Sequence, residues 1–373
     1  MAGMLIALAL CLCGGDSGRK PADPVTVGLG AADFILSLQN ADGRILDCPE
    51  SDVVNEDSNM EYACIGLAAA YRHSGEGKYL DGLAKAIAWL AEREDLTDPT
   101  WKGSWFYAYG VDSPYEPYPL SPGAGIDDAR GVDATSALFV YLLYLHKTLS
   151  GDATLAAAYE DNARAALDFL LANNFDGSKY FYSSWQKSSG TWGLWDYRYA
   201  ADQADVYLGL QAGFFLYGDS SYGDAADAIS ANAAADFYYG GGGRFATGME
   251  NDGSLDTGFE EFNTIFPQGY IPWVFGSSTQ AEAAYAWLES KRNSDGSLAC
   301  YEDDPGYSLS AAVFAMAARS LGRDVPRSSL DWIAMETYDA DNGGIRDTGD
   351  RGSEKFSNVA GFTAAAMLGF DPF

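Results

Sequence analysis

The strongest constraint on the fold is a regular alternation of two kinds of helical segment. From about residue 25, moderately polar segments with one apolar stripe alternate with segments that are apolar on most faces. A helix with one apolar stripe lies at a protein surface, whereas a helix that is apolar nearly all round is buried. The expected outer helices are residues 25–38, 78–93, 154–173, 221–237, 278–292 and 326–335. The expected inner helices are residues 60–72, 133–149, 202–217, 257–275, 307–321 and 357–369.

The connections between these segments differ in length according to their direction. Links from an inner helix to the next outer helix are short and turn-like, as in HSGEGK and LSGDAT. Links from an outer helix to the next inner helix are long, as in residues 94–132 and 174–201. Twelve helices in this order close most simply into a ring of six hairpins whose inner helices form a barrel. Every long loop then lies at the end where the inner helices begin, and long loops in a compact domain are usually functional.

We therefore predict an all-α fold in one domain over residues 21–373, built from a degenerate helical-hairpin repeat. The least secure helix is 257–275, because Pro267 and Pro272 interrupt it.

Residues 1–20 differ from the rest of the chain and predict an export segment followed by a linker. The run MAGMLIALALCLCGG is too short to span a bilayer and resembles the end of a signal peptide. Cys11 or Cys13 is a candidate for lipid attachment, so we expect an exported protein, extracellular or held peripherally at the cell surface by an N-terminal lipid. Cys48 and Cys64 are a candidate disulfide pair.

The charge of the chain narrows the range of partners. A net charge of −30 and a pI near 4.1 repel nucleic acid, anionic lipid and polyanionic glycans, which leaves neutral or cationic partners. Solubility in a salty or extracellular medium is the alternative reason for this charge. The chain has two histidines and no phosphate-binding P-loop, so we expect no metal and no cofactor. We also expect a monomer.

Acidic residues gather where the expected inner helices begin. They are Glu61, Asp133 and Asp205 in the first three inner helices, Glu260 and Glu261 in the fourth, and Asp128 just before the second. An acidic residue in the first turn of a helix also interacts favourably with the helix dipole, so capping is the alternative role for each of them. Capping alone could be served by Ser, Thr or Asn without the repulsion between converging carboxylates. Together these residues predict an acidic cavity.

Two of the long loops are rich in aromatic residues. Residues 101–118 hold seven aromatics in eighteen positions, and residues 175–199 hold nine in twenty-five, against 14% in the whole chain. Trp and Tyr present flat apolar faces with polar edges, which suits stacking on sugar rings, although the loops could also pack on each other as a lid. The candidate substrate-binding residues are Trp101, Trp105, Tyr107, Tyr109, Arg130, Trp185, Trp192, Trp195, Tyr197 and Tyr199.

Carboxylates beside an aromatic trough suit glycoside hydrolysis, in which one carboxyl protonates the leaving oxygen and another activates water or attacks directly. The outer–inner alternation resembles the (α/α)6 toroid of several glycosidase families, most of all glycoside hydrolase family 8 and its relatives. Asn55-Glu56-Asp57 resembles the Ser-Glu-Gly of that family, and YLDGLAKAIAWL resembles its next helix. The resemblance implies that Glu56 is the proton donor and that Asp133 contacts the sugar at the cleavage point.

The roles of the other carboxylates stay open at this stage. Because the Ser and Gly of the family motif are Asn55 and Asp57 here, Glu61 is an alternative donor. Asp205 and Asp128 are the candidates for the base. We predict hydrolysis of a neutral or amino-sugar polysaccharide or oligosaccharide, with retention and inversion both open.

Three other functions use a related architecture. A non-catalytic glycan-binding toroid at a cell surface would keep the aromatic residues and need no carboxyl pair. LSLQNADGRI resembles the repeat of terpene cyclases and protein prenyltransferases, but Arg44 follows Gly43 where those repeats have Trp, and their pocket would be apolar. A polysaccharide lyase must neutralise a uronate, and Arg130 and Arg198 are the basic candidates for that role.

Overall fold

The computed structural model describes residues 20–118, 128–258, 261–299 and 305–373. In these residues all twelve predicted helices form, within a few residues of the expected bounds. The inner helices are α2 (Asn59–Ser74), α4 (Asp133–Ser150), α7 (Asp202–Tyr217), α9 (Glu261–Phe275), α11 (Ser308–Ser320) and α13 (Ser357–Leu368). The outer helices are α1 (Pro24–Leu38), α3 (Gly77–Arg93), α5 (Thr154–Ala158) with α6 (Glu160–Phe169), α8 (Ser220–Asp236), α10 (Thr279–Ser290) and α12 (Arg327–Trp332). Single π turns, η2 (Leu170–Asn174) and η3 (Ile333–Thr337), extend α6 and α12.

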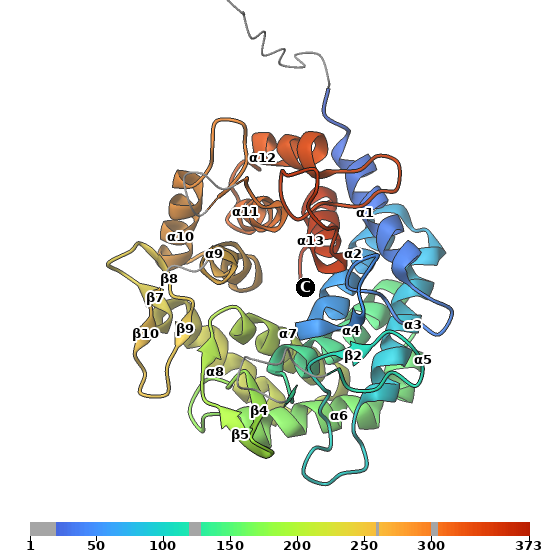
Figure 1. Cartoon of the computed structure of the whole chain (residues 1–373). Helices are drawn as coiled ribbons and strands as arrows, with labels where there is room; N and C mark the ends of the chain where they lie inside the picture. Colours follow the sequence, from blue (N-terminus) through green and yellow to red (C-terminus); the bar gives the residue numbers. More distant parts are fainter. Residues whose placement is uncertain (1–19, 119–127, 259–260, 300–304) are drawn as a thin grey trace, which may run out of the picture.

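The inner helices form a closed ring in which α2, α4, α7, α9, α11 and α13 each contact the next, and α13 returns to α2 (Figure 1). Three of the six junctions are close backbone contacts made at glycines. Gly66 of α2 faces Gly361 of α13, Gly209 of α7 faces Ala137 of α4, and Gly269 of α9 faces Val313 of α11. A Cβ atom on Gly209 would lie 2.3 Å from the Ala137 carbonyl oxygen, so only glycine allows this approach. The (α/α)6 architecture predicted from the alternation is confirmed.

Helix α9 forms even though Pro267 and Pro272 both lie inside it. A proline removes one helical hydrogen bond, but burial of the helix between its neighbours compensates for this loss. Tyr270, Ile271 and Trp273 are all buried, in the face that packs within the ring.

A small hairpin follows every outer helix and repeats around the ring. Its closing pairs are Gln39–Ile45, Asp95–Ser104, Phe175–Phe181, Tyr238–Phe245, Arg292–Leu298 and Tyr338–Ile345. In four of the hairpins a glycine packs on the backbone of the next outer helix. Gly43 faces Lys85, Gly103 faces Ala165, Gly296 faces Ser328, and Gly343 faces Gly30. The last of these contacts joins the hairpin that follows α12 and η3 to α1 and closes the outer ring.

The long loops contain short strands that the sequence analysis did not predict. β3 (Asp128–Arg130), β4 (Ser184–Ser188) and β5 (Thr191–Trp195) form one antiparallel sheet, and β6 (Arg198–Tyr199), β9 (Gly248–Met249) and β10 (Leu255–Asp256) form another. Two-stranded ladders join β1 (Val53–Val54) to β2 (Tyr109–Gly110) and β7 (Tyr238–Tyr239) to β8 (Arg244–Phe245). The aromatic loop at 175–199 is therefore partly a β-hairpin on the barrel rim.

The far end of the barrel, where the inner helices stop, is covered by the last residues of the chain. The Tyr141 hydroxyl donates to the Pro372 carbonyl at 2.6 Å, and the Trp273 indole donates to the Phe370 carbonyl at 3.1 Å. Cys48 and Cys64 are both buried free thiols, so the candidate disulfide does not form. Among the described residues, no helix has both the length and the apolar character needed to span a bilayer.

Candidate active site

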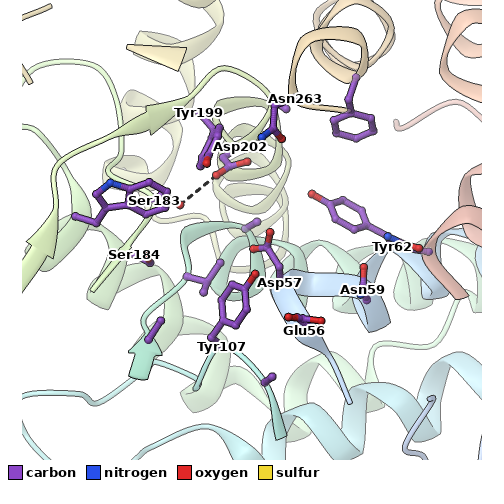
Figure 2. Close-up of a pocket in the computed structure, with 18 of the residues that line it drawn as sticks. Glu56, Asp57, Asn59, Tyr62, Tyr107, Ser183, Ser184, Tyr199, Asp202 and Asn263 are labelled. Carbon is purple, nitrogen blue, oxygen red and sulfur yellow. Dashed lines mark hydrogen bonds between the residues drawn. The ribbon is translucent and has the colours of Figure 1, made fainter. Parts of the chain in front are cut away.

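A cavity of about 670 Å³ opens at the end of the barrel where the inner helices begin. Each of the six inner helices contributes a residue from its first two turns, and the long loops complete the wall. Most of the polar side chains in the lining point into the same space in Figure 2. They include Glu56, Asp57, Asn59, Tyr62, Tyr107, Ser183, Tyr199, Asp202 and Asn263. The cavity therefore lies where the long loops predicted it.

The segment just before α2 carries two of the cavity carboxylates on an unusual backbone. Asn55, Asp57 and Ser58 all adopt left-handed conformations, with φ of 56°, 49° and 69°. Such conformations cost roughly 1–3 kcal/mol for a non-glycine residue and persist only where the surroundings enforce them. Here the buried Asp47 carboxylate enforces them, because it accepts hydrogen bonds from the backbone N–H of Asn55 at 2.8 Å and of Glu56 at 3.0 Å. The result is a turn that projects Glu56 and Asp57 into the cavity.

Asp133 and Asp202 form a carboxyl pair at the cavity wall. Asp133 is fully buried behind the wall, and its Oδ1 accepts the Ala134 N–H at 2.9 Å. Asp202 lines the cavity, and its carboxyl is hydrogen bonded to Asp133 and, at 3.5 Å, to the Ser183 hydroxyl. Burial and the neighbouring Asp202 raise the pKa of Asp133 well above its ordinary value. Burial and the charges of Asp57 and Asp205 also raise the pKa of Asp202 well above its ordinary value. Two carboxylates in contact cannot both be ionised, so the pair keeps a proton, which full burial favours on Asp133.

Asp57 is the second carboxyl with altered proton affinity that opens on the cavity. Asp57 is exposed to solvent in the open cavity, where desolvation by the surrounding walls and the charge of Glu56 raise the pKa of Asp57 to about 6. Asp57 and Asp202 both line the cavity, and the charge of Asp57 raises the pKa of Asp202. Desolvation also raises the pKa of Glu56. One cavity thus holds carboxyl groups that release their protons over different pH ranges, which is the arrangement that acid–base catalysis requires.

Like Asp133, which does not line the cavity as the expected contact with the sugar requires, two further predicted carboxylates lie behind it. Asp205 is fully buried and accepts hydrogen bonds from the hydroxyls of Tyr62 at 2.7 Å and Tyr270 at 2.5 Å. Glu61 is also fully buried, and its Oε1 accepts the Asn55 side-chain amide at 3.2 Å. Desolvation raises the pKa of Asp205 to about 7 and that of Glu61 to about 8. Asp205 orients Tyr62, which does line the cavity.

Three of the predicted aromatic residues line the cavity: Tyr107, Trp195 and Tyr199. The Trp195 ring stacks on Tyr197 with ring centroids 5.7 Å apart and meets Tyr199 edge-on. Tyr197 itself is buried, and its hydroxyl donates to Asp256 at 2.8 Å. A sugar ring in the cavity would therefore meet aromatic side chains on the side formed by β5 and β6.

The remaining predicted residues serve the scaffold, which corrects the sequence analysis. Arg130 is buried between Trp101 and Phe106 and pairs with Asp95 at 3.2 Å. Trp185 and Trp192 also pack on Trp101. All of these lie outside the cavity lining, because they join the β3–β4–β5 sheet to the barrel.

Further predicted residues also lie away from the cavity. Trp105 is fully buried and donates to the Leu90 carbonyl at 2.8 Å, and Tyr109 packs on Trp89. Asp128 lies on β3 opposite Lys187 and does not line the cavity. Glu260 falls outside the described residues, and so does the side chain of Glu261.

The sequence analysis missed Asp57 and Asp202 as cavity residues. Asp202 is the first residue of α7, three positions before the residue chosen there, and a helix start alone does not say which of two first-turn carboxylates faces inward. Asp57 occupies the Gly position of the Ser-Glu-Gly resemblance. The available signal was the glycine that the family has at this position, because glycine often marks a left-handed backbone, and Asp57 does adopt one.

The described lining of the cavity is acidic and holds no Lys, Arg or His. Arg198, the other basic candidate, is buried in an ion pair with Asp176 at 2.9 Å. His73 and His146 lie near the C-terminal ends of α2 and α4, at the far end of the barrel. The charge of this cavity therefore favours a neutral or cationic ligand.

Comparison with known proteins supports the fold. No family model and no curated protein sequence matches the chain. Solved structures do match it over nearly its whole length. An unsaturated glucuronyl hydrolase from Bacillus sp. GL1 is 13% identical with a TM-score of 0.64, covering 93% of this chain and 95% of its own. A D-mannose isomerase is 11% identical with a TM-score of 0.66, covering 92% and 96%. A GH76 α-mannanase from Bacteroides thetaiotaomicron is 15% identical with a TM-score of 0.62, covering 94% and 96%.

The fold is an (α/α)6 toroid. At 11–15% identity, these likenesses concern the architecture alone.

Proposed function

We propose that the protein is a glycoside hydrolase that acts on a neutral or amino-sugar polysaccharide or oligosaccharide. The observation that carries this proposal is the presence in one cavity of two carboxyl systems with different proton affinities, Asp57 and the Asp133–Asp202 pair. Hydrolysis of a glycosidic bond needs one carboxyl that gives a proton and another that stays ionised.

The geometry supports a definite division of roles. Asp57, with a pKa of about 6, is the general acid that protonates the leaving oxygen. Asp202 is the carboxylate that activates water or attacks the sugar, in the state in which Asp133 holds the proton of their pair and orients the Asp202 carboxyl by a hydrogen bond. Because burial and the charges of Asp57 and Asp205 raise the pKa of Asp202, this state is reached only as the pH rises. The acidic lining also stabilises the positive charge that develops on the sugar in the transition state. Glu56, the donor implied by the resemblance to family 8, lines the same wall as Asp57 and is the alternative acid.

The solved structures with a similar fold support a carbohydrate substrate, and the charge of the cavity indicates which class of carbohydrate. Two of them are described as a glucuronyl hydrolase and an α-mannanase, and a third as a sugar isomerase. The glucuronyl hydrolase is described as responsible for the degradation of glycosaminoglycan, an anionic polymer. A uronate in the present cavity would meet Glu56, Asp57 and Asp202 with no cation among the described lining residues, so we favour an uncharged or amino sugar.

The test is reducing-sugar release from a panel of neutral, amino and acidic polysaccharides. We expect release from a neutral or amino polymer by the wild type and a loss of at least about 100-fold in kcat for Asp202→Asn. Asp128→Asn is the matched control, since this aspartate lies on the rim strand outside the cavity, and it should keep its activity within about twofold. Binding without release from any polymer would favour a non-catalytic glycan-binding toroid. Release from uronate polymers alone would contradict the substrate class.

A further inference from the structure

The far end of the barrel carries an exposed aromatic patch. The described residues include four large apolar side chains that are strongly exposed, and three of them adjoin: Phe214, Phe215 and Phe373. The Phe215 ring lies 5.9 Å from that of Phe214 and 6.0 Å from that of Phe373, and both Phe215 and Phe373 contact Tyr144 beneath them. Phe215 and Phe373 are 50% and 46% exposed. Contiguous exposed apolar side chains of this kind mark interaction sites.

The N-terminal segment leaves the barrel at the same end. α1 is an outer helix, so it runs toward the cavity and begins at the far end. Gly28, near its start, lies against Leu368 and Met367 at the end of α13, so residues 20–23, which directly precede α1, lie at the far end. Asp23 follows Cys13 by ten positions, and an extended chain over that distance reaches at most about 35 Å. An apolar anchor in residues 4–13 is within reach of the far end and would let that end face the surface in which it inserts.

We propose that this aromatic patch docks on a bilayer of zwitterionic lipid, as a second contact beside the N-terminal apolar segment. One acyl chain gives only marginal, reversible membrane binding, and stable attachment takes a second contact. Aromatic side chains at a protein edge suit the bilayer interface, and the net charge of −30 disfavours anionic lipid. In this orientation the cavity faces away from the membrane, toward polymers in the medium. The docking surface does not depend on the reaction that the cavity performs.

The test uses the full chain with its N-terminal segment and flotation with phosphatidylcholine vesicles. We expect the wild type to float, and the double variant Phe215→Glu, Phe373→Glu to lose at least about tenfold in vesicle partitioning. Leu96→Glu is the matched control, since Leu96 is the fourth exposed apolar side chain, 39% exposed, in a loop at the cavity end. It should float like the wild type. Flotation of the double variant at the wild-type level would overturn the proposal, and so would tighter binding to phosphatidylglycerol than to phosphatidylcholine.

A second measurement guards against misfolding of the double variant. Phe215→Trp should show extra fluorescence quenching by brominated phosphatidylcholine over the wild type, whereas Leu96→Trp should show none. No extra quenching of Phe215→Trp would refute the docking face. The patch would instead be an interface between copies of the chain if the wild type formed dimers without lipid, the double variant were monomeric, and neither protein bound vesicles. That result would overturn the proposal.

Discussion

Glu61→Gln tests the buried acidic layer behind the cavity, and its effect can be worked out from the structure. Glu61 has no exposed surface, one oxygen accepts the Asn55 amide, and Oε2 is buried without a hydrogen-bond partner. Desolvation raises the pKa of this carboxyl from 4.5 to about 8. Glutamine keeps the shape and the acceptor for Asn55, and it removes only the ionisation.

The sign follows from proton linkage. A carboxyl whose pKa is higher in the folded state keeps its full contribution to stability below the unfolded pKa and loses it as the pH rises toward the folded pKa. The wild type therefore loses stability between pH 5 and pH 8 because the unfolded chain ionises at Glu61 and the folded chain does not. At about 1.4 kcal/mol per pKa unit, the part due to Glu61 is about 3–4 kcal/mol of unfolding free energy. Glu61→Gln should be near wild type at pH 5 and more stable by about that amount at pH 8.

The assay is urea unfolding followed by circular dichroism at pH 5, 6, 7 and 8 for the wild type and the variant. Other buried carboxyls such as Asp47 and Asp205 also make the wild type less stable at high pH, so the informative quantity is the difference between the two proteins. Glu50→Gln, at an exposed site in the loop before α2, is the control and should follow the wild type. Parallel pH curves for the wild type and Glu61→Gln would show that Glu61 is ionised in the folded protein, and the reasoning would fail.

Three further predictions concern the cavity and the barrel. Asp57→Asn should lower kcat by about 10²–10⁴-fold if Asp57 is the acid. The wild-type rate should fall as the pH rises through about 6, where Asp57 loses its proton. A pH–rate profile of the wild type, Asp57→Asn and Glu56→Gln separates the two candidate acids, and a fall near pH 6 that persists in Asp57→Asn would exclude Asp57. Asp133→Asn removes the ionisable partner of Asp202 and keeps the hydrogen bond, so it should shift the low-pH side of that profile more than it changes KM. A change in KM with no shift of the profile would indicate a role in binding instead. Gly209→Ala places a Cβ atom 2.3 Å from the Ala137 carbonyl oxygen and should lower the unfolding free energy by at least about 1–3 kcal/mol, whereas Gly193→Ala on the open β5 strand should have little effect; equal melting temperatures would show that α4 and α7 separate easily.

The placement of particular carboxylates shows where prediction from the sequence stopped. Asp202 and Asp205 both lie in the first turn of α7, and the sequence analysis chose Asp205. Helical periodicity puts residues three apart on neighbouring parts of the same face, so it does not say which one reaches a cavity. The hydroxyls of Tyr62 in α2 and Tyr270 in α9 donate hydrogen bonds to Asp205, whereas Asp202 lines the cavity. Those tyrosines are 143 and 65 residues away along the chain.

The aromatic loops show the same limit. Their composition predicted sugar contacts for nine aromatic residues, and three of them line the cavity. The rest pack on Arg130, on outer helices or on each other, because a β-hairpin that covers a barrel end must bury an apolar side of its own. Composition counts aromatic side chains but does not say which side of a strand they occupy.

The sequence by itself determined the twelve helices, their outer and inner order, the ring, and the end of the barrel that holds the cavity. These properties follow from hydrophobic periodicity and loop length, which are local features of the sequence and do not depend on which distant segments come into contact. Only the tertiary structure decided which carboxyls meet. Asp57 reaches the cavity because Asp47, ten residues earlier, holds a left-handed turn. The carboxyls of Asp202 and Asp133 meet, and Asp202 raises the pKa of Asp133, because α4 and α7 pack closely, with Gly209 against Ala137. Proton affinity depends on burial and on neighbouring charges, and those exist only once distant segments have packed together.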